Sequence, residues 1–279
     1  WYQGEDCGDC IAQIALTEPA HLCDWQQKFE AGKQLGRMVR GFPKTPPLVV
    51  PRPSPLRGRI SRFWVMEFDE QESKAIHDRA SREAGFLMFM PYALTAGVQA
   101  FDAALRARGG KGQDYIISVS VDARTRETAA QRLFFNNLSF LFFHIPEASV
   151  GDRQNLLGTI RMQMYEQVKS GFPRALSESS MLMRILPRSV LARLLLWLMN
   201  GELSSFAFSS VNKRGYPASR FMDADVANLF HMPLVPVPPG IGLFVNEFGS
   251  VLNVVLSYLD GMLSSEDVSL FDADLRRLL

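Results

Sequence analysis

The sequence carries almost no net charge, because 30 lysine and arginine residues face 29 aspartate and glutamate residues. The bulk charge therefore gives no reason to expect binding to nucleic acid or to an anionic membrane. Runs of about 18 uncharged apolar residues are also lacking, which argues against a membrane-spanning helix. The nearest is 181–199, which is interrupted by Arg184, Pro187, Arg188 and Arg193. We expect a helix packed against the core there, with a helix on a lipid surface as the lesser alternative.

The chain has no initiator methionine, and nothing that resembles a signal peptide accompanies Trp1. We therefore expect a piece of a longer protein whose N-terminal part lies upstream. The expected location is the cytoplasm, either free or in peripheral contact with a membrane.

Cysteine is scarce, and an odd number of three residues does not suggest a disulfide framework. Cys7 and Cys10 have the C-x-x-C spacing, and His21 and Cys23 follow, so side chains of the kinds that bind zinc share a short stretch. His21 and Cys23 are unusually close for a zinc site. We expect free thiols and no bound metal.

Proline marks the clearest boundary in the chain. Residues 43–55 read PKTPPLVVPRPSP, where prolines remove backbone donors and bias their predecessors towards extended conformations. The sequence predicts a helical remnant of an N-terminal half in 1–42, a proline-rich linker in 43–57 and a main C-terminal subdomain in 58–279.

Apolar periodicity predicts a mixture of helices and strands. The closing unit is a hairpin, 241–248 and 251–259, followed by a helix. Ser264 begins this helix, and Asp267, three positions on, forms a near capping box with it. The other predicted strands are 59–68, 115–121, 134–146, 204–211 and 227–235, and the predicted helices are 24–40, 69–85, 86–107, 153–170 and 181–199.

Individual side chains are predicted within these elements. The helix of 153–170 places Leu157, Ile160, Met164 and Val168 on one apolar face. His77 is expected on a solvated face, and His231, among apolar neighbours, is expected in the core with its polar groups satisfied.

Four stretches resemble one known family in the same order. They are VSVDAR, NNLSFLFFHIP, SSFAFSSVNKRGYP and PPGIGLFVNEFGSVLNVVLSY. They are similar to the C-terminal half of the CoA-dependent acyltransferase superfamily, which includes chloramphenicol acetyltransferase, peptide-synthetase condensation domains and bacterial wax ester synthase/diacylglycerol acyltransferases. The resemblance implies an α/β (α+β) sandwich, in which helices cover a mixed sheet.

The resemblance also implies roles for single residues. A polar group at the end of a central strand would hold the oxyanion of the tetrahedral intermediate. Asp122 and Arg124 would shape the fold near the channel, although a buried ion pair and a turn are the plainer alternative. The matching oxyanion positions are Ser209, Ser210 and Asn212, and the candidates for substrate or CoA contact are Asn136, Asn137, Lys213 and Arg214.

The superfamily's H-H-x-x-x-D-G motif, which carries the general base, is absent, since none of the four histidines has that context. We expect the base upstream of Trp1. The expected function is O-acyl transfer from acyl-CoA, a co-substrate, to a hydroxyl acceptor in lipid-type ester formation, with the N-terminal half as partner and no permanently bound cofactor. The alternatives are a non-catalytic acyl-binding or interaction domain and a condensation-like domain that uses carrier-protein thioesters.

Overall fold

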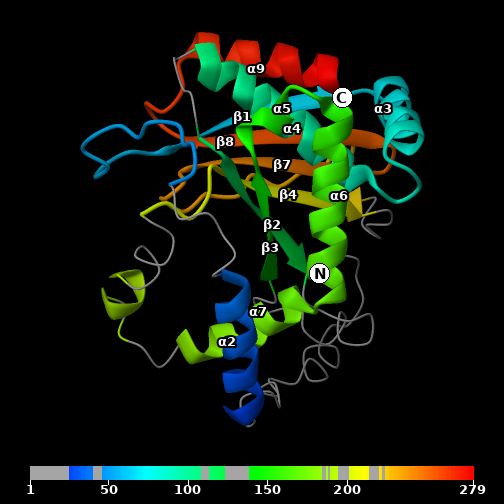
Figure 1. Cartoon of the computed structure of the whole chain (residues 1–279). Helices are drawn as coiled ribbons and strands as arrows, with labels where there is room; N and C mark the ends of the chain where they lie inside the picture. The colour runs from blue at the N-terminus through cyan, green and yellow to red at the C-terminus, as the bar shows by residue number, and fades with distance from the viewer. Residues whose placement is uncertain are drawn as a thin grey trace.

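A computed structural model describes residues 25–39, 46–107, 113–122, 138–183, 187, 189–193, 201–213, 220–221 and 224–279. Its centre is a six-stranded sheet with the order β1-β8-β7-β4-β2-β3 (Figure 1). The central pairs β7–β4 and β4–β2 are parallel, and the other pairs are antiparallel. The strands are β1 (Ser61–Phe68), β2 (Tyr115–Asp122), β3 (Leu138–Ile145), β4 (Phe206–Lys213), β7 (Ile241–Phe248) and β8 (Val251–Leu259).

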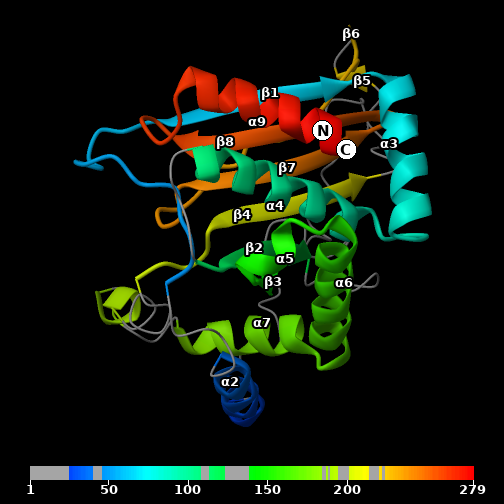
Figure 2. The same cartoon turned by 45° about the horizontal axis from the view of Figure 1, so that its top comes forward.

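Helices cover one face and one edge of this sheet (Figures 1 and 2). Two of them, α4 and α9, lie over the face, α6 follows the β3 edge, and α2 packs against α7. A two-stranded ribbon, β5 (Arg220–Phe221) and β6 (Ala224–Asp225), stands apart from the sheet. The helices are α2 (Trp25–Val39), α3 (Glu70–Glu83), α4 (Phe89–Ala107), α5 (Glu147–Val150), α6 (Arg153–Lys169), α7 (Phe172–Met183) and α9 (Ser265–Leu278).

The core lies between the sheet and the α4–α9 pair. Phe101 of α4 stacks on Phe206 of β4, with ring centroids 4.2 Å apart, and lies 4.7 Å from Phe271 of α9. At Gly97 the helix comes so near β7 that an added Cβ would lie 2.9 Å from Leu243. A side chain at this position would have to displace the end of the Leu243 side chain within the packed core.

Two helix starts follow the sequence closely. The Asp69 side chain accepts from the backbone of Glu72 at 2.8 Å, and Glu72 accepts in return from the backbone of Asp69 at 2.9 Å. Ser264 and Asp267 form the same reciprocal capping box at α9. The cap of Ser264 and Asp267 was predicted and is confirmed, because the signal is local and needs no tertiary contact.

The strand predicted over 227–235 is wrong. Residues 226–236 are irregular, and Pro233 lacks the amide hydrogen that a ladder needs. The backbone there binds side chains of the sheet instead: His231 N donates to Asn246 Oδ1 at 3.3 Å. His231 is exposed rather than in the core, because this segment lies on the outside of the sheet.

The other helix predictions are only partly right. Leu157 and Ile160 of α6 are buried as expected, but Val168 is exposed, because the turns near it run along the sheet edge. The predicted helix of 181–199 is interrupted, since α7 ends at Met183 and Pro187 is not helical. Residues 189–193 are helical with Val190 exposed, and the remainder of that stretch lies outside the described residues.

The proline-rich segment packs on the body of the protein. Leu48 and Val50 are buried in the main core, and Leu48 N donates to Asp114 O at 2.9 Å. Arg52 forms a bidentate ion pair with Glu202. The proposed division into 1–42, 43–57 and 58–279 stays a prediction. Among the described residues, no helix combines the length and apolarity needed to cross a membrane.

Candidate functional site

Strand alternation separates the candidate residues of β4 onto two faces. Phe206 and Phe208 point towards α4, as the Phe101 stack and the contact at Gly97 show. Side chains alternate along a strand, so Ser210 shares that helix-covered face and Ser209 lies on the opposite one. We call the face that carries Ser209 the second face of the sheet.

Ser209 lies at the centre of the sheet, where β4 has a parallel neighbour on each side. It faces Ser120 of β2 and Phe244 of β7 in register, and only 8% of it is exposed. Among the described residues its hydroxyl makes no hydrogen bond. An unpaired hydroxyl with slight access to solvent, beside a second serine, can donate to an anionic oxygen.

Polar side chains continue along the second face at the entrance to β4. Ser118 Oγ and Ser204 Oγ lie 3.2 Å apart, and Ile116 N donates to Ser205 Oγ at 3.2 Å. Ser118 and Ser120 belong to the same side of β2 because they are two positions apart. These contacts hold β2 and β4 against each other. Among the described residues, Ser120 and Ser209 are the hydroxyls of β2 and β4 on the second face that make no hydrogen bond.

Over β7 and β8 the second face is covered by residues 226–240. Asn228 and Asn253 exchange amide hydrogen bonds of 2.9 Å in both directions, and Asn253 is fully buried. An added Cβ on Gly242 would lie 2.9 Å from Val235, so glycine permits this close approach. The asparagines of this region therefore have a structural role.

The remaining candidate residues are described in part or not at all. Asp122 is exposed at the end of β2. Asn212 and Lys213 are backbone members of β4, in register with Glu247 and Phe248, and their side chains are not described. Eight candidates lie outside the described residues: Cys7, Cys10, His21, Cys23, Arg124, Asn136, Asn137 and Arg214.

Sequence reasoning missed a group of charged side chains at the carboxyl ends of β4 and β7. His77 was expected on a solvated face, but it is largely buried, with its ring 4.5 Å from that of Phe89 and Nε2 3.5 Å from Glu247 Oε1. A surface depression of about 520 Å³ beside it is lined by Glu70, Lys74 and Ser250 as well. His77 follows the buried Ile76 and precedes Ala80 by three positions, a spacing that could have signalled its burial.

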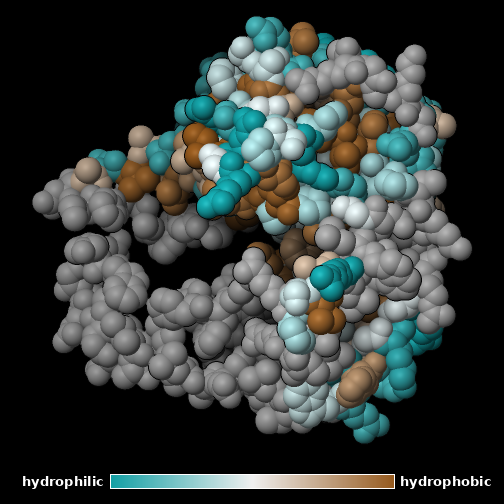
Figure 3. Space-filling model, turned by 90° about the vertical axis from the view of Figure 1, so that its left-hand side faces the viewer, coloured by the Kyte–Doolittle hydropathy of each residue, from teal (hydrophilic) through white to brown (hydrophobic). Residues whose placement is uncertain are grey.

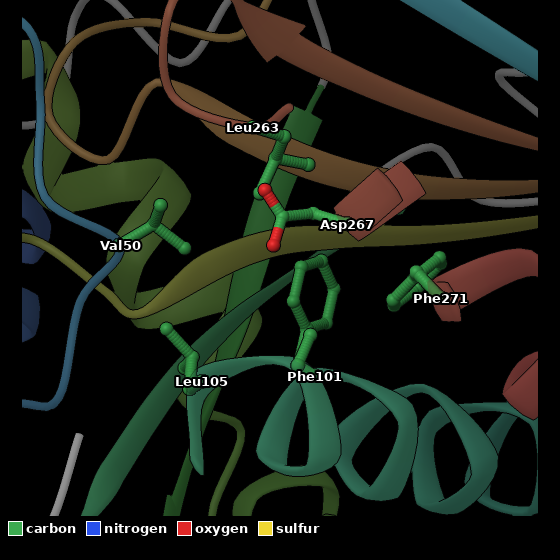
Figure 4. Close-up of a pocket in the computed structure, with 7 residues that line it drawn as sticks. Val50, Phe101, Leu105, Leu263, Asp267 and Phe271 are labelled. Atoms are coloured by element: carbon green, nitrogen blue, oxygen red, sulfur yellow. The ribbon is translucent and has the colours of Figure 1, made fainter. Parts of the chain in front are cut away.

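The space between α4 and α9 is small, and the described residues show no cluster of metal ligands. A crevice between α4 and α9 holds only about 10 Å³, roughly the space of one water molecule (Figure 4). It is lined by Val50, Phe101, Ala104, Leu105, Leu263, Asp267 and Phe271. Within the described ranges, no three histidine, cysteine, aspartate or glutamate side chains come together as metal ligands would.

One titratable group in the core is strongly perturbed. Burial raises the pKa of the Tyr115 phenol, and the nearby Asp102 carboxylate raises it further. The phenol donates to Asp102 Oδ1 at 2.9 Å, and Arg106 pairs with the other carboxylate oxygen at 2.6 Å. This network joins β2 to α4 and is structural, because it lies away from the second face.

On the side of the molecule that carries the proline-rich loop, hydrophobic side chains of the described part lie between hydrophilic ones (Figure 3).

Comparison with known proteins gives a fold. No family model and no curated protein matches the chain. Among solved structures, the chain is similar to the trichothecene 15-O-acetyltransferase of Fusarium sporotrichioides, with a TM-score of 0.62, 14% identity, and coverage of 94% of this chain and 53% of that one. It is also similar to the EpoB cyclization-docking bidomain of Sorangium cellulosum, with a TM-score of 0.61, 15% identity, and coverage of 96% of this chain and 50% of that one.

The epimerization domain from the third module of tyrocidine synthetase B gives a TM-score of 0.57 at 10% identity, and 98% of this chain covers 58% of that one. The chain thus spans about half the length of these proteins. Its fold is that of the chloramphenicol acetyltransferase-like proteins, and the predicted mixed sheet covered by helices is confirmed.

Proposed function

We propose that the chain is the C-terminal half of an acyltransferase that moves an acyl group from a thioester to a hydroxyl acceptor. The observation that carries this proposal is the Ser209 hydroxyl, which is unpaired within the described chain at the centre of an acetyltransferase-like sheet. The N-terminal half of the same protein would be the partner that completes the site.

In this reaction the acceptor hydroxyl attacks the thioester carbonyl carbon while a general base takes its proton. The carbonyl oxygen becomes an oxyanion, to which Ser209 donates a hydrogen bond. Collapse of the intermediate breaks the carbon–sulfur bond, and the thiolate leaves and takes the proton back from the base. The base is the histidine of the H-H-x-x-x-D-G motif, which this sequence lacks, so the chain supplies the oxyanion contact and part of the channel.

Acyl-CoA is the proposed donor, with Lys213 and Arg214 as contacts for its phosphates and Asn136 and Asn137 as further substrate contacts. A carrier-protein thioester is the second candidate, favoured by the peptide-synthetase domains among the similar structures. Competition between free CoA and a loaded carrier protein in one assay distinguishes the two donors.

Variants of β4 test the oxyanion role in a protein that includes the catalytic histidine motif. Ser209→Ala should lower kcat by roughly a hundredfold to a thousandfold with little change in KM, as for loss of an oxyanion donor. Ser210→Ala removes the neighbouring hydroxyl on the helix-covered face and should have little effect. Unchanged kcat in Ser209→Ala, or an equal loss in both variants, would exclude Ser209 as the donor. Acyl-CoA binding without turnover in the unaltered protein would instead favour a non-catalytic binding domain.

A further inference from the structure

The loop between α3 and α4 displays two large apolar side chains to solvent. Phe86 is 82% exposed and Leu87 is 81% exposed, more than any other large hydrophobic residue that the structure describes. Gly85 and Leu87 have φ angles of 100° and 62°, in the left-handed region that residues other than glycine rarely adopt. Phe86 and Leu87 thus lie at the exposed tip of a tight turn.

An apolar groove of about 510 Å³ along α6 continues from this loop. Met88 forms one end of its lining, and both views place the loop beside α6 (Figures 1 and 2). The α6 residues of the groove include Met162, Tyr165 and Val168, which are 55%, 63% and 61% exposed. We call Phe86, Leu87, Met88, Met162, Tyr165 and Val168 the loop–α6 patch.

Cations border the loop–α6 patch. Arg161 lines the groove itself, Lys169 lies with its ammonium 5.6 Å from the Tyr165 ring centroid, and Arg82 is exposed on the last turn of α3. Glu166 is the one acidic residue in the α6 sequence. The other carboxylate nearby, Glu83, is paired with Arg153 at 3.0 Å. Three cationic side chains, Arg82, Arg161 and Lys169, therefore lie on the two helices beside the patch, although the whole chain is nearly neutral.

We propose that the loop–α6 patch docks on a membrane surface that contains anionic lipid. Phe86 and Leu87 enter the boundary between headgroups and acyl chains, and the Tyr165 ring lies at headgroup level, where amphipathic aromatic rings are favoured. Arg82, Arg161 and Lys169 face the lipid phosphates, which complement their charge. A protruding apolar pair ringed by cations suits a lipid surface better than the flat, weakly charged centre of a protein interface. This inference is independent of acyl transfer.

Sedimentation with vesicles tests the proposal, using phosphatidylcholine vesicles with and without phosphatidylserine. The unaltered chain should bind the vesicles with phosphatidylserine, and binding should weaken as salt is raised. Phe86→Asp with Leu87→Asp should weaken binding at least about tenfold, because two apolar side chains lose their lipid contact. Asparagine and aspartate tolerate the left-handed region comparatively well, so the substitution at Leu87 suits its backbone.

The matched control is Leu234→Asp with Leu270→Asp, which changes two leucines that are 73% and 56% exposed outside the patch. This control should bind vesicles as the unaltered chain does. Equal binding by the patch variant and the control would overturn the proposal. So would a patch variant that changes the oligomeric state in gel filtration and leaves vesicle binding unaltered, because the patch would then join two copies of the chain.

A charge variant tests the lipid class. Arg161→Gln with Lys169→Gln should weaken binding to phosphatidylserine vesicles by about fivefold for each lost cation at low salt. The same variant should leave any residual binding to pure phosphatidylcholine unchanged. If the charge variant loses binding equally to vesicles with and without phosphatidylserine, the patch does not recognise the anionic lipid.

Discussion

Replacing Gln163 and Gln167 of α6 by methionine should destabilise the protein, because these side chains complete the free edge of β3. Gln163 accepts from His144 N at 2.9 Å and donates to His144 O at 2.6 Å. Gln167 accepts from Phe142 N at 2.9 Å and donates to Phe142 O at 2.8 Å. The two amides thereby act as a substitute strand along an edge that would otherwise be open to another chain.

The magnitude follows from these hydrogen bonds. Each intramolecular hydrogen bond makes a net contribution of about 0.5–1.5 kcal/mol to the free energy of unfolding. Because water can reach part of this edge, the lower half of that range applies. The double variant should therefore lose about 2–4 kcal/mol of unfolding free energy. Gln163→Glu should lose at least as much as Gln163→Met, because one carboxylate oxygen would then face the carbonyl of His144 without a proton to donate.

Urea unfolding followed by circular dichroism measures these losses, with Gln154→Met as the control. Gln154 is exposed on the same helix, and its side chain makes no hydrogen bond within the described chain, so the control corrects for helix propensity. The double variant should also aggregate at a lower concentration than the control does. A loss of less than about 0.5 kcal/mol, or one equal to that of Gln154→Met, would refute the edge-protection reasoning.

The remaining predictions concern Tyr115 and two helical glycines. The pKa of Tyr115 is raised in the folded state, so the folded protein holds the phenol proton more tightly than the unfolded chain does. The associated stability is present below about pH 10, the pKa of tyrosine in the unfolded chain, and falls as pH rises above it. Tyr115→Phe should flatten this alkaline decline in urea unfolding and cost about 1 kcal/mol of unfolding free energy at neutral pH, because the hydrogen bond to Asp102 is lost. Gly97→Val should destabilise the protein by about 1–3 kcal/mol through collision with Leu243. Gly158→Ala, in open space on α6, should stabilise the protein by about 0.5–1 kcal/mol. Thermal melts that rank the two variants in the opposite order would contradict this packing.

Local sequence signals predicted the elements well where one face is buried and the ends are capped. The hairpin of β7 and β8 and the caps at Asp69 and Ser264 depend on neighbours within a few residues. The resemblance to acyltransferases supplied the architecture, which short-range patterns alone do not encode. Strand order, with β4 between two parallel neighbours, required the structure.

The candidate site was harder to predict because it depends on which face each side chain occupies. Ser209 and Ser210 are adjacent in sequence but lie on opposite faces of β4, and only the packing of Phe206 on α4 reveals which is which. The approach of His77 to Glu247 joins α3 to β7, which are far apart in the sequence. The segment near His231 resembled a strand because its composition is apolar, although proline and side-chain contacts determine its actual path.

The central proposal is that this chain is one half of an acyltransferase and needs the other half for turnover. The most direct measurement compares CoA release from palmitoyl-CoA, with a long-chain alcohol as acceptor, between this chain and a longer one that includes the H-H-x-x-x-D-G motif. The account predicts release and ester formation by the longer chain only, and a much slower rate when it carries Ser209→Ala. Turnover by this chain alone, or neither binding nor turnover of acyl thioesters by the longer chain, would contradict the account.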